Sequence, residues 1–183
     1  FQLPNQSFSV AQQLQDGVRG FMLDVHNDLF GIPTLQHGVT GYVLGNEPLE
    51  DVLVDMKQFL DQNPNEILTI IFEAYVSASK MDTVFTSAGL KPYLFTQTFG
   101  QPWPTLQEMI DNDERLVVFS DEDDAGQGQE WYHYVWDYCV ETDYSNSSKA
   151  DFSCNFNRGD SINSLFILNH LIHVKKITLI LYH

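Results

Sequence analysis

The sequence predicts a parallel α/β domain, and three observations support this prediction. Segments with helical periodicity alternate along the chain with short segments rich in branched and aromatic residues. The short segments are apolar at nearly every position, which is typical of strands in a parallel sheet that is covered on both faces. Neither an internal repeat nor a linker divides the 183 residues, so we expect a single domain.

The first part of the chain is expected to form a helix that leads into a strand. Ser9 is a suitable N-cap for a helix over Val10–Asp16, and Gly17 ends it. Val18–Val25 follows as a strand because it is rich in branched and aromatic residues. A loop rich in Gly and Pro then extends to about Pro48.

The middle of the chain repeats the order of helix and strand. Leu49–Leu60 carries apolar residues at the helical period, and Asn63-Pro64 ends this helix. Ile67–Phe72 is a continuous apolar run of strand length, as expected for a buried strand.

The remaining elements follow the same pattern. Short helices are expected near Met81–Ala88 and at Thr105–Asp111, and strands at Leu116–Phe119 and Leu165–Leu168. Two polar segments are expected to be surface loops: Asp121–Gln129 and Ser145–Asp151. We expect the four strands to be parallel neighbours, but this pattern alone does not separate an eight-stranded barrel from an open doubly wound sheet.

The composition excludes several classes of partner and site. The net charge of −16 repels nucleic-acid backbones, so we expect no nucleic-acid partner. No apolar run approaches the roughly 20 residues that span a bilayer, so we expect no transmembrane segment. There is no G-x-G-x-x-G after a strand and no G-K-[ST], which leaves dinucleotide and nucleoside-triphosphate sites without support. The acidic residues are either a solvated surface or, in part, ligands of a divalent cation.

Two features of the sequence concern the cellular compartment. Cys139 and Cys154 are close enough in sequence for one bridge in an oxidising compartment, and they are equally consistent with two unpaired thiols. Asn5 and Asn146 each begin a triplet that fits the N-glycosylation pattern. Together these features favour secretion or the secretory pathway, with the cytoplasm as the alternative.

Two acidic residues stand where neighbouring strands are expected to end. Asp24 lies at the carboxyl end of the first strand, and Glu73 directly follows Phe72 in the second. The carboxyl ends of barrel strands form the catalytic face, where two carboxylates could hold a hard cation through their oxygens. Taken singly, each is more simply explained as a solvated residue that has just left its strand.

Two histidines are candidates for the same site. His37 is a loop histidine followed by Gly38, so its imidazole could reach a ligand and act as an acid or base near neutral pH. His26 projects to the same face as Asp24, because side chains alternate along a strand.

An ordered series of short motifs runs through the chain. The first part of the series contains Asn5-Gln6-Ser7, Gln13-Leu14, GVRGFMLD from Gly17, and His37. The second part contains FLDQNPNEI from Phe59, TIIFE from Thr69, WPTL from Trp103, RLVVF from Arg115, NRG from Asn157 and LNH from Leu168. From about residue 5 to residue 170 this series resembles the phosphatidylinositol-specific phospholipase C X-domain-like phosphodiesterase family, most closely its plant, fungal and other eukaryotic members.

The resemblance implies a distorted (β/α)₈ TIM-type barrel that hydrolyses phosphoric diesters of phospholipids or lipid-like substrates. In this family two histidines flank the phosphodiester: one takes a proton from the attacking hydroxyl, and the other protonates the leaving alkoxide. His37 matches the second histidine. An alkoxide is a poor leaving group unless an acid delivers a proton to it, which gives the match a chemical reason.

The resemblance also implies roles for residues of the first two strands. Asp24 and Glu73 match calcium-ligand positions of the metal-dependent members, which implies a divalent metal such as Ca²⁺. Met22 stands where those members place another acidic ligand, which leaves the metal site incomplete. His26 stands where relatives more often carry an aromatic residue; we interpret it as a packing ring, with an added ligand or a proton relay as alternatives. Arg19 is interpreted as structural, because strand alternation turns it away from Asp24.

Both ends of the family domain are expected to be missing. The family's first catalytic histidine lies in a Thr-His-Asn motif upstream of the segment that begins at Asn5, and residues 174–183 resemble nothing in the family. A full barrel takes about 250 residues, so we expect a single partial domain over residues 1–183 that is nearly inactive by itself.

Two alternatives to a phospholipase C-like enzyme stay open. One is a non-catalytic remnant that binds a ligand or partner through the barrel mouth, and the other is a related barrel enzyme acting on glycerophosphodiesters or choline lipids. The expected partners are a phospholipid or small phosphodiester substrate and, peripherally, a membrane.

Overall fold

The computed structural model describes residues 8–36 and 47–169. These residues form two compact units, one that ends at Val135 and one that begins at Trp136, and each is described by itself. His37, the glycosylation triplet at Asn5 and the segment 174–183 lie outside the described residues.

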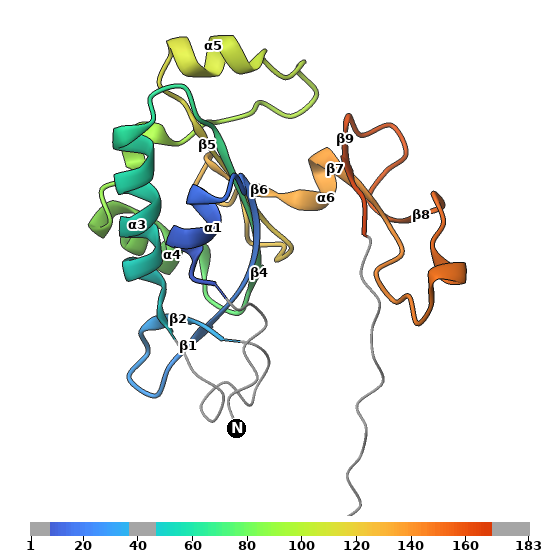
Figure 1. Ribbon diagram of the computed structural model, residues 1–183, viewed down its shortest axis with the longest axis horizontal. Coiled ribbons are helices and arrows are strands. Elements are labelled where there is room, and N and C mark those ends of the chain that lie inside the picture. Colours follow the sequence, from blue (N-terminus) through green and yellow to red (C-terminus); the bar gives the residue numbers. More distant parts are fainter. Residues whose placement is uncertain (1–7, 37–46, 170–183) are drawn as a thin grey trace, which may run out of the picture. The chain divides into compact units, whose positions relative to one another are not determined.

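A six-stranded mixed sheet organises the first unit, with the strand order β3-β2-β1-β4-β5-β6 (Figure 1). Its strands are β1 (Gly20–Asn27), β2 (Pro33–Leu35), β3 (Glu47–Pro48), β4 (Leu68–Ala74), β5 (Leu116–Ser120) and β6 (Tyr132–Tyr134). β1, β4, β5 and β6 are parallel, whereas β2 and β3 are antiparallel at one edge. The expected α/β class and the parallel order of the first three predicted strands are therefore confirmed.

The sheet is open among the described residues. β3 and β6 are its outer strands and do not pair with each other there, so these residues form no closed barrel. The TIM-type barrel stays a prediction.

α1, α3 and α4 cover one face of this sheet, whereas α5 lies beyond one end of it (Figure 1). The helical elements are α1 (Val10–Gln15), α3 (Leu49–Gln62), α4 (Ala78–Ser87), the 3₁₀ turn η1 (Lys91–Tyr93) and α5 (Leu106–Asp111). Ser9 caps α1 as expected, because its hydroxyl accepts from the Gln12 N–H at 3.2 Å. Gly17 follows this helix with φ of 97°, a conformation that a residue with a side chain rarely adopts. Thr105 and Glu108 form a reciprocal capping box at the start of α5.

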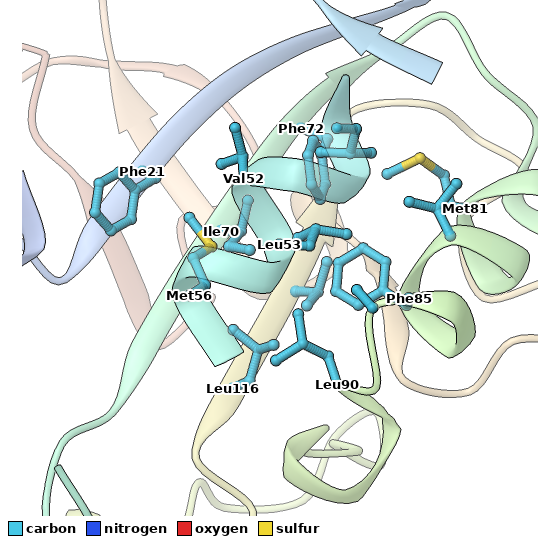
Figure 2. Packing of buried hydrophobic residues seen from close by; sticks show 14 of the residues in the cluster. Phe21, Val52, Leu53, Met56, Ile70, Phe72, Met81, Phe85, Leu90 and Leu116 are labelled. Carbon is cyan, nitrogen blue, oxygen red and sulfur yellow. The ribbon is translucent and has the colours of Figure 1, made fainter. Parts of the chain in front are cut away.

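The main core lies between α3, α4 and the sheet (Figure 2). In α3, Met56 follows Leu53 by three residues and Val52 by four, so these buried side chains share the face that packs on the strands. The rings of Phe72 in β4 and Phe85 in α4 meet edge to face at 6.2 Å. Burying each large apolar side chain contributes about 1.5–3 kcal/mol, so this layer dominates the stability of the unit.

Two arginines, which lie just before the amino ends of β1 and β5, link these strands to neighbouring segments. The guanidinium of Arg115, which is 3% exposed, donates to the backbone carbonyls of three residues: Leu60, Asn63 and Glu66. Arg19 donates from Nε to the Glu66 carboxylate at 2.6 Å and stacks on the Phe59 ring at 4.6 Å. These contacts confirm the structural interpretation of Arg19.

The segment between η1 and α5 covers the other face of β5 and β6. The Trp103 ring packs 6.1 Å from that of Phe119, and the Gln97 N–H donates to Nε2 of His133 at 2.9 Å. Nδ1 of His133 lies 2.9 Å from the Val118 carbonyl, so it carries the proton and donates. Burial lowers the pKa of His133 below its usual value. All five residues of β5 are buried as a result, as predicted for a strand covered on both faces.

The second unit contains a three-stranded sheet of order β8-β7-β9. Its elements are β7 (Cys139–Thr142), the 3₁₀ turn η2 (Lys149–Asp151), β8 (Phe156–Arg158) and β9 (Leu165–Ile167), and α6 (Val135–Tyr138) joins β6 to β7. The expectation that Leu165–Leu168 neighbours the strands of the first sheet is wrong, because β9 pairs in parallel with β7. Sequence patterns did not predict β7, because Glu141 interrupts its apolar residues with a charged one. This carboxylate is 1% exposed and accepts from Arg158 and Asn169.

The second unit also bears on the cysteines and on one glycosylation triplet. Cys139 is buried and Cys154 exposed, and both are free thiols. Burial, assisted by the nearby Glu141 charge, raises the pKa of Cys139 to about 12, so this thiol is unreactive. Asn146 is 3% exposed and its Nδ2 donates to the Asp143 carbonyl at 2.8 Å, so the folded unit does not present it as a glycan acceptor.

Candidate functional site

The structure brings Asp24 and Glu73 to adjacent positions. They are direct partners in the parallel pairing of β1 and β4, near the carboxyl ends of both strands. Alternation along the strands sends Phe21 and Val25 into the core under the helices, so Asp24 points to the opposite face, where Glu73 also lies. Asp24 is half-buried and Glu73 is exposed. Whether the two carboxylates hold a metal stays a prediction.

Tyr75 holds the Glu73 carboxylate. It follows β4 directly, and its hydroxyl donates to Oε1 of Glu73. This hydrogen bond, together with burial and the negative charges of Glu73, Asp121 and Asp24, raises the pKa of Tyr75 to about 12. The phenol therefore stays protonated at neutral pH and acts as a permanent donor to one Glu73 oxygen.

His26 stacks on the same tyrosine. The two rings lie 4.1 Å apart and are inclined by 10°. Among the described residues, Nε2 of His26 is buried and has no hydrogen-bond partner. The stacking agrees with the interpretation of His26 as a packing ring, and its alternative roles as a ligand or proton relay stay predictions.

Acidic residues after β5 approach the same edge of the sheet. Oδ1 of Asp121 accepts from the Ala74 N–H at 3.3 Å, and Oδ2 of Asp124 accepts from the Ala78 N–H at 2.9 Å. Asp124 thereby satisfies an N–H in the first turn of α4. Burial and the surrounding carboxylates raise the pKa of Glu122. The carboxyl edge of the sheet is thus strongly negative.

The described residues alone do not fit a divalent cation. No group of three or more His, Cys, Asp or Glu side chains suited to a metal occurs in the described part of the chain. Tyr75 engages one Glu73 oxygen, and Met22, on the same face and 62% exposed, offers only a thioether. We therefore derive no chemical step through a metal.

Sequence reasoning missed Tyr75 and could have found it. A tyrosine two residues after Glu73 continues the alternation of β4, which places both on one face. By contrast, no pattern predicts that His26 of another strand stacks on it, since that contact depends on the pairing of β1 with β4.

A groove of about 490 Å³ lies away from this site, beside Trp103 and Glu108. It adjoins the amino end of β5, where the Phe95 N–H donates to the Leu116 carbonyl. Asp24 and Glu73 lie at the opposite ends of their strands, so the groove is not part of the candidate site.

Comparison with protein families decides between the barrel families considered from the sequence. A family model described as PI-PLC X matches residues 1–182. The chain belongs to the PI-PLC X domain family. A PI-PLC X domain-containing protein of Arabidopsis thaliana is 35% identical over 182 residues, which are 91% of this chain and 42% of the relative. PI-PLC X domain-containing protein 1 of Arthroderma benhamiae is 28% identical over 93% of this chain and 58% of the relative.

Two further similarities extend the comparison. An uncharacterized secreted protein of Arthroderma benhamiae is 25% identical over 93% of this chain and 41% of its own length. The phosphatidylinositol-specific phospholipase C of Listeria monocytogenes superposes with a TM-score of 0.56 at 20% identity, covering 81% of this chain and 55% of that enzyme. This likeness shows a shared fold. The chain spans about half the length of the relatives it matches. The activity, substrates and partners of the whole protein are therefore treated as proposals below.

Proposed function

We propose that the carboxyl edge of β1 and β4 belongs to the active site of a phosphoric diester hydrolase that acts on phospholipids or lipid-like phosphodiesters. The observation that supports this most is the placement of Asp24 beside Glu73 on the sheet face opposite the helices in a PI-PLC X domain. Parallel α/β folds place their ligands at the carboxyl ends of strands, which is where this pair lies.

The proposed chemistry is acid and base catalysis on phosphorus. A hydroxyl oxygen attacks the phosphorus and loses its proton to a base, while the bond from phosphorus to the leaving oxygen breaks. His37 donates a proton to that leaving oxygen, so the product departs as an alcohol rather than an alkoxide. An imidazole suits this role because its pKa lies near neutrality.

Asp24 and Glu73 are proposed to act through their charge. Two carboxylates beside a phosphate anion repel it unless a positive group lies between them. That group would be either a divalent cation such as Ca²⁺, for which the described residues alone supply too few ligands, or the protonated imidazole of a catalytic histidine. In the second case the carboxylates stabilise the imidazolium, so the histidine stays protonated and can act as the acid.

One observation favours the alternative of a non-catalytic binding domain. Tyr75 engages a Glu73 oxygen that a metal-dependent enzyme would need, and the described residues hold no third ligand. A domain of this kind would bind a phosphodiester or partner at the same edge without turning it over.

We further propose that the protein is secreted and meets its substrate at a membrane from outside. A relative that bears the name of a secreted protein supports this. No helix among the described residues combines the length and apolar character needed to cross a bilayer.

Release of water-soluble phosphorylated headgroup from phospholipid vesicles tests the proposed function. The protein is expressed from its complete gene and, in parallel, as these 183 residues, with calcium and with a chelator. His37→Ala should lower the rate by about 10²–10⁴-fold, and His173→Ala, a histidine with no proposed role, should leave it unchanged. Equal rates for His37→Ala and the unaltered protein would refute the mechanism. Activity that survives chelation would refute the proposed metal role of Asp24 and Glu73 but would not affect the proposed role of His37 as the acid.

A further inference from the structure

The groove beside Trp103 lies between α5 and the loop that precedes it. Pro102 and Pro104 flank Trp103, and each proline restricts its own backbone φ. Thr105 then begins α5 through its capping box with Glu108, so both walls of the groove have a defined backbone. The volume of about 490 Å³ lies within the range of about 300–1,000 Å³ that is usual for small-molecule sites.

Trp103 supplies an aromatic surface to this groove. The side chain is half-buried, and its ring packs 5.6 Å from the ring of Phe95 and 6.1 Å from that of Phe119. These two contacts hold the indole from the side of the core, while Trp103 also lines the groove. A ligand that stacks on the indole therefore need not immobilise it first, which lowers the entropic cost of binding.

Hydrogen bonds fix the loop that forms the other part of the wall. Gln97 is 6% exposed, and its N–H donates to Nε2 of His133 at 2.9 Å. The Gln97 side chain donates from Nε2 to the Gln101 carbonyl at 2.7 Å and to the Pro102 carbonyl at 3.4 Å. The Gln101 N–H donates to the Thr98 carbonyl at 3.1 Å. The groove is therefore preformed rather than shaped by its ligand.

The polar groups of the groove restrict the chemistry of that ligand. Among the described residues that line it there is no Lys, Arg or His, so a phosphate or other anion finds no charge partner there. Amides and hydroxyls both donate and accept hydrogen bonds, whereas carboxylates at neutral pH only accept. The groove offers all three kinds of group: the amides of Gln101 and Asn112, the hydroxyls of Thr96 and Thr98, and the carboxylates of Glu108 and Glu114.

We propose that this groove binds a neutral saccharide. Each sugar hydroxyl is both a donor and an acceptor, which matches a lining of amides, hydroxyls and carboxylates. The C–H groups on one face of a sugar ring complement the negative π face of the Trp103 indole. An organic ammonium ion fits less well, because it only donates and would leave the amide N–H groups unpaired. The site is separate from Asp24 and Glu73, so it does not rest on the proposed function.

Titration with trisaccharides tests the proposal on the protein expressed from its complete gene. Maltotriose, cellotriose, chitotriose and mannotriose are added singly and followed by calorimetry and by the indole N–H signals in nuclear magnetic resonance spectra. At least one should bind with a Kd of about 1 mM or tighter. The signal of Trp103, identified by its loss in Trp103→Phe, should shift, and those of Trp131 and Trp136 should stay in place.

A pair of double variants locates the binding. Gln101→Ala/Asn112→Ala removes two exposed groove side chains and leaves their backbone hydrogen bonds intact, so the association constant should fall by at least about tenfold. The matched control is Gln62→Ala/Asn65→Ala, which removes two exposed amides outside the groove and should bind as the unaltered protein does. Equal unfolding midpoints exclude a general loss of structure as the cause.

Spermidine serves as the cationic probe in the same titrations. A neutral sugar should bind equally at low and high salt, whereas binding of spermidine to an acidic protein weakens as salt is added. Each of three results would overturn the proposal: no binding of any trisaccharide, equal weakening by both double variants, or a shift of the Trp103 signal with spermidine alone. Saccharide binding by a protein that releases no headgroup would refute the proposed function and leave this site intact.

Discussion

The two faces of the first sheet differ, although the same strands build both. In β4, Leu68, Ile70 and Phe72 are completely buried beneath the helices, whereas Ile71 is half-buried and Glu73 is exposed on the other side. The helix-covered face contributes most to the stability of the unit, and on the opposite face β1 and β4 carry the carboxylates, the His26–Tyr75 stack and the proposed chemistry. Substitutions at neighbouring residues of one strand should therefore have different effects: on the helix-covered face they should change stability, and on the opposite face they should change the proposed activity.

Phe72→Ala should produce the largest loss of stability. Phe72 is completely buried and meets Phe85 edge to face, so truncation leaves a cavity and should lower the free energy of unfolding by about 3–5 kcal/mol. Urea denaturation monitored by circular dichroism measures this. Ile71→Ala on the half-buried face is the control, and an equal loss for both would remove the distinction between the faces.

Much of the helix-covered face can be predicted from the sequence, and much of the opposite face cannot. The apolar period of Leu49–Leu60 and the run Ile67–Phe72 predict their helix and strand because burial alone decides them. The strand over Cys139–Thr142 was missed because its buried Glu141 is satisfied by distant side chains. The contact of His26 with Tyr75 depends on strand pairing, which no local pattern encodes.

Arg115→Met should cost less than the core truncation. It keeps apolar contacts but removes the donors to the carbonyls of Leu60, Asn63 and Glu66, so the free energy of unfolding should fall by about 1–3 kcal/mol. The control is Lys57→Met, which breaks the exposed ion pair with Asp61 and should change stability by less than about 0.5 kcal/mol. A larger loss of stability for Lys57→Met than for Arg115→Met would contradict the stabilising role assigned to the buried hydrogen bonds of Arg115.

His133 should make the first unit less stable in mild acid. Its pKa is lowered in the folded state, so below the ordinary value of 6.5 the unfolded chain takes up a proton that the folded chain does not. Stability is therefore complete above pH 6.5 and declines as the pH falls from there towards the lowered pKa. Unfolding midpoints between pH 7.5 and 5 should show a smaller decline in His133→Gln. An identical decline in both proteins would refute the role of His133.

Tyr75→Phe should have the smallest effect on stability. The ring keeps its stack on His26 and the exposed Glu73 turns to water, so the free energy of unfolding should fall by no more than about 1 kcal/mol. Alkaline absorbance titration gives a sharper measure, because the variant should lose a phenol that ionises near pH 12. In Glu73→Gln the same phenol should ionise at lower pH, and an unchanged titration would show that Glu73 does not hold it.

We propose that Asp24 and Glu73 serve the candidate site and not the stability of the fold. The most direct test is the rate of headgroup release by the Asp24→Asn/Glu73→Gln double variant, expressed from the complete gene, at a temperature well below its measured unfolding midpoint. Removing two like charges from paired positions should leave the free energy of unfolding unchanged or raise it by up to about 1 kcal/mol. The rate should nevertheless fall by at least about tenfold, because the charge that acts on the reacting groups is lost. An undiminished rate, or a rate that falls only as far as the folded fraction falls, would contradict the claim.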